Sequence, residues 1–180
     1  MRHRASTPVP PNRNMKIESP KDLLFDQLRD LRSVEEQLVK ALPELVEKAE
    51  YPGLVKMLRS HAAETENQLA RLDGLFERYA INTRTDKCKA MAGLLKGGAC
   101  HLKKVSNPRT RDLMMVAHCL RIEQYEIAAY EITVRLARQT GFEPVEQILN
   151  ELVARERAAK SQLEQIEPAI FGLSQEEEAA

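Results

Sequence analysis

Four segments of the chain carry apolar residues at alternating steps of three and four, the spacing that places side chains along one side of an α-helix. We expect these helices at Pro20–Leu45, Leu54–Tyr79, Pro108–Ala137 and Pro144–Ile170. No segment shows the alternation of apolar and polar residues that is typical of a half-buried strand. The pattern therefore predicts an all-α protein whose four helices pack around a shared core.

Residues that begin and end helices stand at the borders of these segments. Ser19 and Asn107 each precede a proline, which is the order of an N-cap and a first helical residue. Gly141 is placed to end the third long helix. The turn at 51–53 is short, so the first two helices are expected to run antiparallel.

The remaining segments divide the chain. Residues 1–14 combine prolines with polar and basic side chains and are predicted to be a flexible arm. Residues 15–170 form the bundle, and residues 171–180 read as an acidic flexible tail. Between the two helix pairs, Lys87 to Val105 can form one weaker helix. We thus expect a ferritin-like four-helix bundle with an additional helix in the connection between the second and third long helices.

Composition excludes several function classes. Lys plus Arg and Asp plus Glu are equal at 27 each, and Trp is absent, so neither a basic surface nor a stacking platform for nucleic acid is expected. No apolar run reaches the roughly 18 residues of a membrane helix. The three cysteines form no CxxC pair, suit a reducing compartment, and read as small core residues. These features predict a cytoplasmic protein.

Each of the four apolar stripes is interrupted near its middle by acid. An ionised carboxylate buried without a partner costs several kcal/mol, and carboxylates that meet in one core repel one another. Cations solve both problems, and a carboxylate can bridge two of them. Glu64 lies three residues after His61, and Glu126 lies three residues after Glu123. Residues three apart share one face of a helix, so the two members of each pair could serve one site. The predicted metal ligands are Glu35, His61, Glu64, Glu123, Glu126 and Glu156.

Other interpretations of these residues stay open. A salt-bridged or hydrogen-bonded polar layer can also set the register of a helical bundle. His61 is either a ligand or a residue that orients a ligating acid by a hydrogen bond. Tyr130 is either ordinary packing or a hydrogen-bonding group beside the metals.

Five segments together resemble the bacterial YciF-like family of the ferritin-like superfamily. They are VEEQLVKALPEL from Val34, HAAETENQLARLD from His61, KCKAMAGLL from Lys87, IEQYEIAAY from Ile122 and RERAAKSQL from Arg155. The resemblance runs from Met15 to about Ile166. It implies a small helical protein, often a dimer, that is associated with stress responses and has a ferritin-like carboxylate site. The family's inner acidic positions correspond to Glu35, Glu64, Glu123, Glu126 and Glu156.

Two functional hypotheses follow. In the first, the chain binds two iron or manganese ions for ferroxidase-like or peroxide-consuming chemistry with oxygen or peroxide. In the second, it is a structural stress protein whose acids pair with Lys160 and Arg121, because Lys160 stands where the similar family usually has an acid. A homodimer is expected from the resemblance and from apolar residues outside the four stripes. These residues are Met114, Met115, Ile122 and Ile132.

Overall fold

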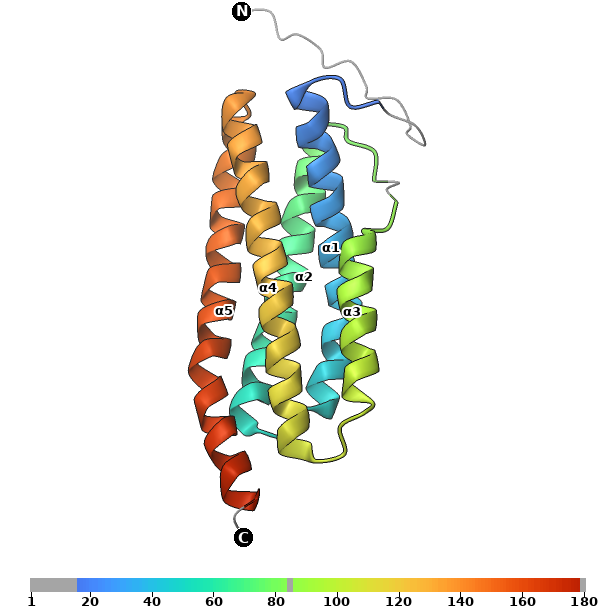
Figure 1. Cartoon of the computed structure of the whole chain (residues 1–180). Helices are drawn as coiled ribbons and strands as arrows, with labels where there is room; N and C mark the ends of the chain where they lie inside the picture. Colours follow the sequence, from blue (N-terminus) through green and yellow to red (C-terminus); the bar gives the residue numbers. More distant parts are fainter. Residues whose placement is uncertain (1–15, 84–85, 179–180) are drawn as a thin grey trace, which may run out of the picture.

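The computed structural model describes residues 16–83 and 86–178, with side chains as far as Gly172. Within these residues it contains five α-helices and no strand (Figure 1). The helices are α1 (Pro20–Lys48), α2 (Pro52–Arg78), α3 (Lys89–Leu102), α4 (Pro108–Gln139) and α5 (Glu143–Glu178). The all-α prediction is confirmed, and the predicted arm at 1–14 lies outside the described residues.

The four long helices form a bundle of two antiparallel pairs, α1 with α2 and α4 with α5. Contacts of α1 with α4 and of α2 with α5 close the bundle. The shorter α3 belongs to the connection between the two pairs and packs against α4 and α1 (Figure 1). It therefore covers the α1/α4 side of the bundle.

The predicted helix borders are confirmed. The Ser19 hydroxyl accepts a hydrogen bond from the backbone N–H of Asp22 at 3.1 Å, and Asn107 caps α4 through Thr110 at 2.9 Å. Gly141 follows α4 with φ at +74°, a conformation that glycine adopts without steric cost. Local capping chemistry thus sets where α1 begins and where α4 begins and ends.

The predicted acidic tail begins too early. The backbone stays helical through Pro168 and as far as Glu178, so 171–178 belongs to α5. Glutamate and glutamine have high helix propensity, and a solvated segment that contains them can continue a helix that is already formed. The acidic composition of this segment does not exclude helix.

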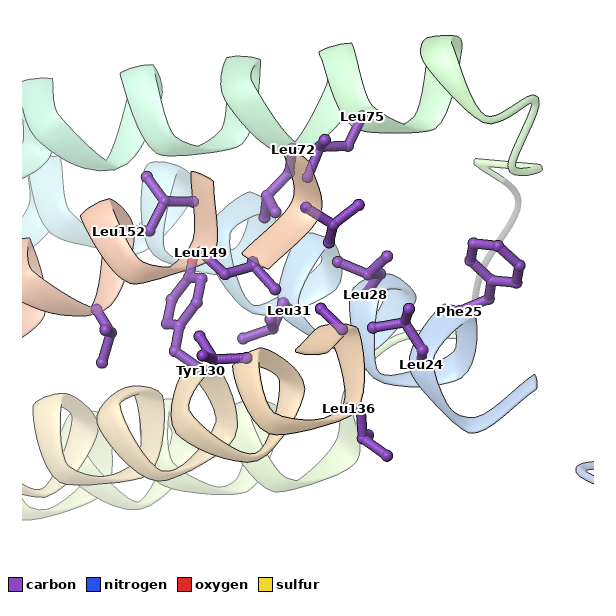
Figure 2. Packing of buried hydrophobic residues seen from close by; sticks show 14 of the residues in the cluster. Leu24, Phe25, Leu28, Leu31, Leu72, Leu75, Tyr130, Leu136, Leu149 and Leu152 are labelled. Atoms are coloured by element: carbon purple, nitrogen blue, oxygen red, sulfur yellow. The ribbon is translucent and has the colours of Figure 1, made fainter. Parts of the chain in front are cut away.

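Two apolar clusters fill the bundle, one on each side of a polar layer. The first includes Leu28, Leu31, Leu72, Leu149 and Leu152 beside Tyr130 (Figure 2). The second includes Leu38, Leu58, Cys119, Ala159 and Leu163. Along each long helix the two clusters are separated by the positions that carry the predicted ligands, so the interrupted stripes are confirmed as the core.

The surface is less apolar than the sequence suggested. Met115 and Ile122 are buried in the same cluster as Met91 and Leu102 of α3. The additional helix therefore covers two of the four residues that were expected to be free for a partner. Ile132 is exposed, and the homodimer stays a prediction.

The three cysteines differ in exposure. Cys88 and Cys119 are buried, whereas Cys100 on α3 is exposed, so the interpretation of all three as core residues is wrong for Cys100.

In the described part of the chain, none of the helices has the length and apolar character that crossing a bilayer requires.

A buried carboxylate joins the α1–α2 turn to α4. Asp112 is 1% exposed, and its oxygens accept the backbone N–H groups of Glu50 at 3.1 Å and Tyr51 at 2.6 Å. The N-cap residue of α2, Tyr51, makes no capping hydrogen bond with its side chain. Asp112 therefore satisfies backbone donors that the local sequence leaves free.

Replacing Asp112 by alanine tests this connection. We expect Asp112→Ala to lower the free energy of unfolding by about 1–3 kcal/mol, because the part-buried backbone N–H groups of Glu50 and Tyr51 lose a charged acceptor. Urea denaturation measures the change. The control is Asp86→Ala, an exposed aspartate whose loss should change stability by less than about 0.5 kcal/mol. Equal effects of the two substitutions would contradict the role of Asp112.

Candidate metal centre

The polar layer gathers side chains from all four long helices. His61 of α2, Glu123 and Glu126 of α4 and Glu156 of α5 each offer a ligand atom, and these atoms lie within 4.8 Å of one another. All four residues are buried. Glu35 of α1 is fully buried beside them, and its charge acts on Glu123 and Glu126. The structure thus brings together five of the six predicted ligands.

His61 is held in the form that binds metals. Burial lowers its pKa to about 4, so its imidazole is neutral near pH 7. Its Nε2 atom lies 3.2 Å from Glu123 Oε1 but makes no aligned hydrogen bond with a described residue. A neutral imidazole nitrogen beside carboxylates is a common ligand of transition metals.

The four buried acids have strongly perturbed titration. Burial is the main cause that raises the pKa values of Glu35, Glu123 and Glu126 well above the usual range, and repulsion by Glu156 raises them further. Burial also raises the pKa of Glu156, to about 7. Without a cation, the layer must therefore retain protons that exposed carboxyl groups lose near pH 4.5.

Two neutral side chains orient these acids. The Tyr130 hydroxyl donates a hydrogen bond to Glu35 Oε1, and the Gln68 amide donates one to Glu156 Oε1. Tyr130 therefore has the hydrogen-bonding role that the sequence left open, besides its packing. The role of Gln68 was missed, although it stands in the polar middle of the second stripe between His61 and Leu72.

The layer contains acceptors without donors. One carboxylate oxygen of each buried acid has no hydrogen-bond partner among the described residues: these are the Oε2 atoms of Glu35, Glu123, Glu126 and Glu156. Buried polar atoms are nearly always paired, because leaving them unpaired costs about 1–3 kcal/mol each. Carboxylate oxygens with one imidazole form a donor set that suits iron, manganese or zinc. The residues present therefore fit a divalent metal site.

Glu64 is the predicted ligand that lies apart. Its side chain is 41% exposed, and its Oε1 atom lies 3.7 Å from Arg155 Nη1 on α5. Three residues of helix rotate a side chain to about 60° from its starting direction. Because His61 points into the core, Glu64 is turned toward the seam between α2 and α5. Glu64 therefore lies at the edge of the layer, outside the set of converging ligand atoms, although its charge still raises the pKa of Glu156, and its role as a ligand stays a prediction.

The cations of the second hypothesis also lie apart. The Lys160 ammonium pairs with Glu164, one turn further along α5. Arg121 is exposed, and its guanidinium lies 3.3 Å from His118 Nδ1. Neither forms an ion pair with the buried acids, so the prediction of a core neutralised by Lys160 and Arg121 is wrong. The carboxylates lack a protein counter-charge from these two side chains.

Comparison with known proteins establishes the family. A family described as "Domain of unknown function (DUF892)" matches residues 19–176. The chain belongs to this family. Protein YciF of Escherichia coli (strain K12) is 29% identical over 150 residues, which cover 83% of this chain and 90% of that protein. The resemblance to YciF-like proteins is thus confirmed.

Solved structures share the fold of this DUF892 chain. The crystal structure of the E. coli stress protein YciF matches with a TM-score of 0.82 and 26% identity, over 87% of this chain and 99% of that one. YcfI from Rhodopseudomonas palustris matches with a TM-score of 0.80 and 32% identity, over 83% and 95%. A protein of Xanthomonas campestris pv. campestris, 21% identical, shares the fold with a TM-score of 0.73 over 90% and 100%.

The raised pKa values predict how metal-free protein responds to pH. A carboxyl group whose pKa is higher in the folded than in the unfolded chain stabilises the fold at low pH, and this contribution is lost as pH rises toward the folded value. The pKa of His61 is shifted in the opposite direction, but this shift changes the stability only below about pH 6.5, where the imidazole of the unfolded chain becomes protonated. We therefore expect the free energy of unfolding of chelator-treated protein to fall by at least about 1 kcal/mol between pH 6.5 and 8.

Chemical denaturation at the two pH values checks this expectation. Glu156→Gln should raise stability at pH 8 and reduce the pH dependence, because an amide cannot ionise and no longer repels the other acids. Glu151→Gln, which removes an exposed charge from the same helix, should leave the pH dependence unchanged. Stability that rises from pH 6.5 to 8 in the wild-type chain would contradict the raised pKa values.

Proposed function

We propose that this YciF-like protein binds two iron or manganese ions in the polar layer and uses them in ferroxidase-like or peroxide-consuming chemistry during stress. One observation carries the proposal: four buried carboxylate oxygens and one neutral imidazole nitrogen in the same layer of the bundle have no hydrogen-bond partner among the described residues. The E. coli relative is described as a stress protein, which supports the physiological part.

The ligands divide according to their positions. His61, Glu123, Glu126 and Glu156 approach one another closely enough to hold one ion. A second ion would need further oxygen ligands, and Glu35 of α1 would provide one, since its Oε2 atom is buried without a hydrogen-bond partner among the described residues. When bound, iron or manganese supplies the one-electron steps that reactions with oxygen or peroxide require.

The surrounding residues prepare the layer for this chemistry. The apolar clusters on both sides exclude water along the bundle axis. Tyr130 and Gln68 hold Glu35 and Glu156 by donating hydrogen bonds, so the other oxygen of each acid stays free for a cation. Binding must displace the protons that raised pKa values retain on the acids, so metal affinity should increase with pH.

Metal analysis tests the proposal directly. Chelator-treated protein is mixed anaerobically with excess Fe(II) or Mn(II), desalted, and analysed by mass spectrometry for metal. We expect two ions per chain and an increase in melting temperature of roughly 5–10 °C per site, because binding at about 100 times Kd adds about 2.7 kcal/mol to the folded state. Retention of no metal by the wild-type chain would refute the proposal.

Two variants sharpen the metal test. Glu126→Gln should reduce the retained metal to one ion or less and slow Fe(II) oxidation in air, which absorbance follows. The control Glu131→Gln changes a residue of the same helix that pairs with Arg157 at the surface, and it should retain two ions. If the wild-type chain retained two ions but did not oxidise Fe(II) faster than buffer alone, the result would support metal binding and contradict the redox role.

A further inference from the structure

We propose that cations reach the buried centre through the groove between α2 and α5, and that the Glu64–Arg155 ion pair controls this route. The inference rests on the proposed function, since it concerns how the metal enters. It gives Glu64 a role as the first carboxylate that a cation meets, outside the set of ligands that hold it at the end.

The two ends of the layer are closed by apolar packing, and a hollow of about 180 Å³ between α1, α3 and α4 has a mainly apolar lining that includes none of the buried acids and not His61. Along the bundle axis, Leu31, Leu72 and Leu152 belong to the buried cluster on one side of the layer, and Leu38 and Leu58 belong to the cluster on the other. Around the bundle, α1 packs on α2 and α4 packs on α5, while α3 covers the α1/α4 side. The α2/α5 side is the remaining seam between the two helix pairs.

This remaining seam contains a groove. It has a volume of about 380 Å³, and Glu64, Gln68, Arg71 and Arg155 are among its lining residues. A hydrated cation can enter a groove of this size and polarity. Most residues that line the groove are polar, although Ala63 and Leu152 also belong to its wall, whereas the two ends of the layer are packed with leucine.

Gln68 links the groove to the acids. It lines the groove, is 3% exposed, and donates its amide N–H to Glu156 on the inner side. Its carbonyl oxygen Oε1 is buried and has no partner among the described residues, as is also true of Glu156 Oε2. Gln68 thus contacts both the groove and Glu156, and its unpaired oxygen is available to a passing cation.

Glu64 and Arg155 stand at the outer end. Their side chains are 41% and 64% exposed, and the 3.7 Å separation of Oε1 and Nη1 is longer than a hydrogen-bonded pair. Exposed pairs of this kind are weak, so a divalent cation can displace the guanidinium from the carboxylate. Arg155 then competes with the metal for Glu64, and the two residues must have opposite effects on the rate of loading.

The experiment compares the rate of loading with the final metal content. Chelator-treated full-length protein is mixed with Co(II) in a stopped-flow instrument, and a fluorescent indicator reports the free metal. We expect Glu64→Gln to load at least tenfold more slowly than wild type yet to retain the same number of ions. Arg155→Gln should load severalfold faster with the same final content.

A matched control separates the route from general surface charge. Glu151 pairs with Arg71 at 2.5 Å, another acid of α5 paired with an arginine of α2, and Arg71 lines the same groove. Glu151→Gln removes the same charge as Glu64→Gln, and it should load within about twofold of wild type because Glu151, unlike Glu64, is not among the residues that line the groove.

Each other result overturns the proposal. Loading of Glu64→Gln at the wild-type rate, or equal slowing by Glu151→Gln, would show that Glu64 has no special place on the route. Loss of an ion from Glu64→Gln at equilibrium would make Glu64 a ligand of the centre. In these cases wild-type protein still binds metal and the proposed function stands, whereas a wild-type chain that binds no Co(II), Fe(II) or Mn(II) overturns both.

Discussion

Mutual repulsion among buried carboxylates is the constraint around which this bundle is organised. Glu35, Glu123, Glu126 and Glu156 come from three helices and meet where apolar clusters on both sides exclude water. Burial and repulsion raise their pKa values, so the layer must hold either protons or cations. A layer of leucines would stabilise the same helices more simply, and retaining four acids there is most readily explained by a ligand that needs them.

The additional helix makes the two sides of the bundle different. Because α3 packs on α1 and α4, it covers one seam between the helix pairs and buries Met115 and Ile122 there. The opposite seam retains a groove whose inner wall includes Gln68, the hydrogen-bond donor to Glu156. A symmetric up-and-down bundle would have two equivalent seams. Here the connection between the pairs makes one side structural and leaves the other for exchange with solvent.

Local patterns predicted most of the fold, and they were least successful for side chains near the rim of the core. The caps at Ser19 and Asn107 and the terminator Gly141 act within one helical turn, so sequence alone locates them. The sequence could not place Glu64 at the edge of the layer, because a position 60° from the centre of a stripe can face the core or the seam, depending on the neighbouring helix. Lys160 was misplaced because its long side chain can reach either inward or along its own helix to Glu164.

The spacing of apolar residues and acids determined by itself that this chain forms a bundle with carboxylates near the middle of its helices, because helical periodicity decides which residues share a face. Tertiary structure decided the rest: that the acids lie at one level, that Tyr130 and Gln68 hold two of them, and that Arg155 pairs with Glu64 outside. The relative shift and rotation of the helices set these relations. They come from the packing of the whole core, which a single stripe does not encode.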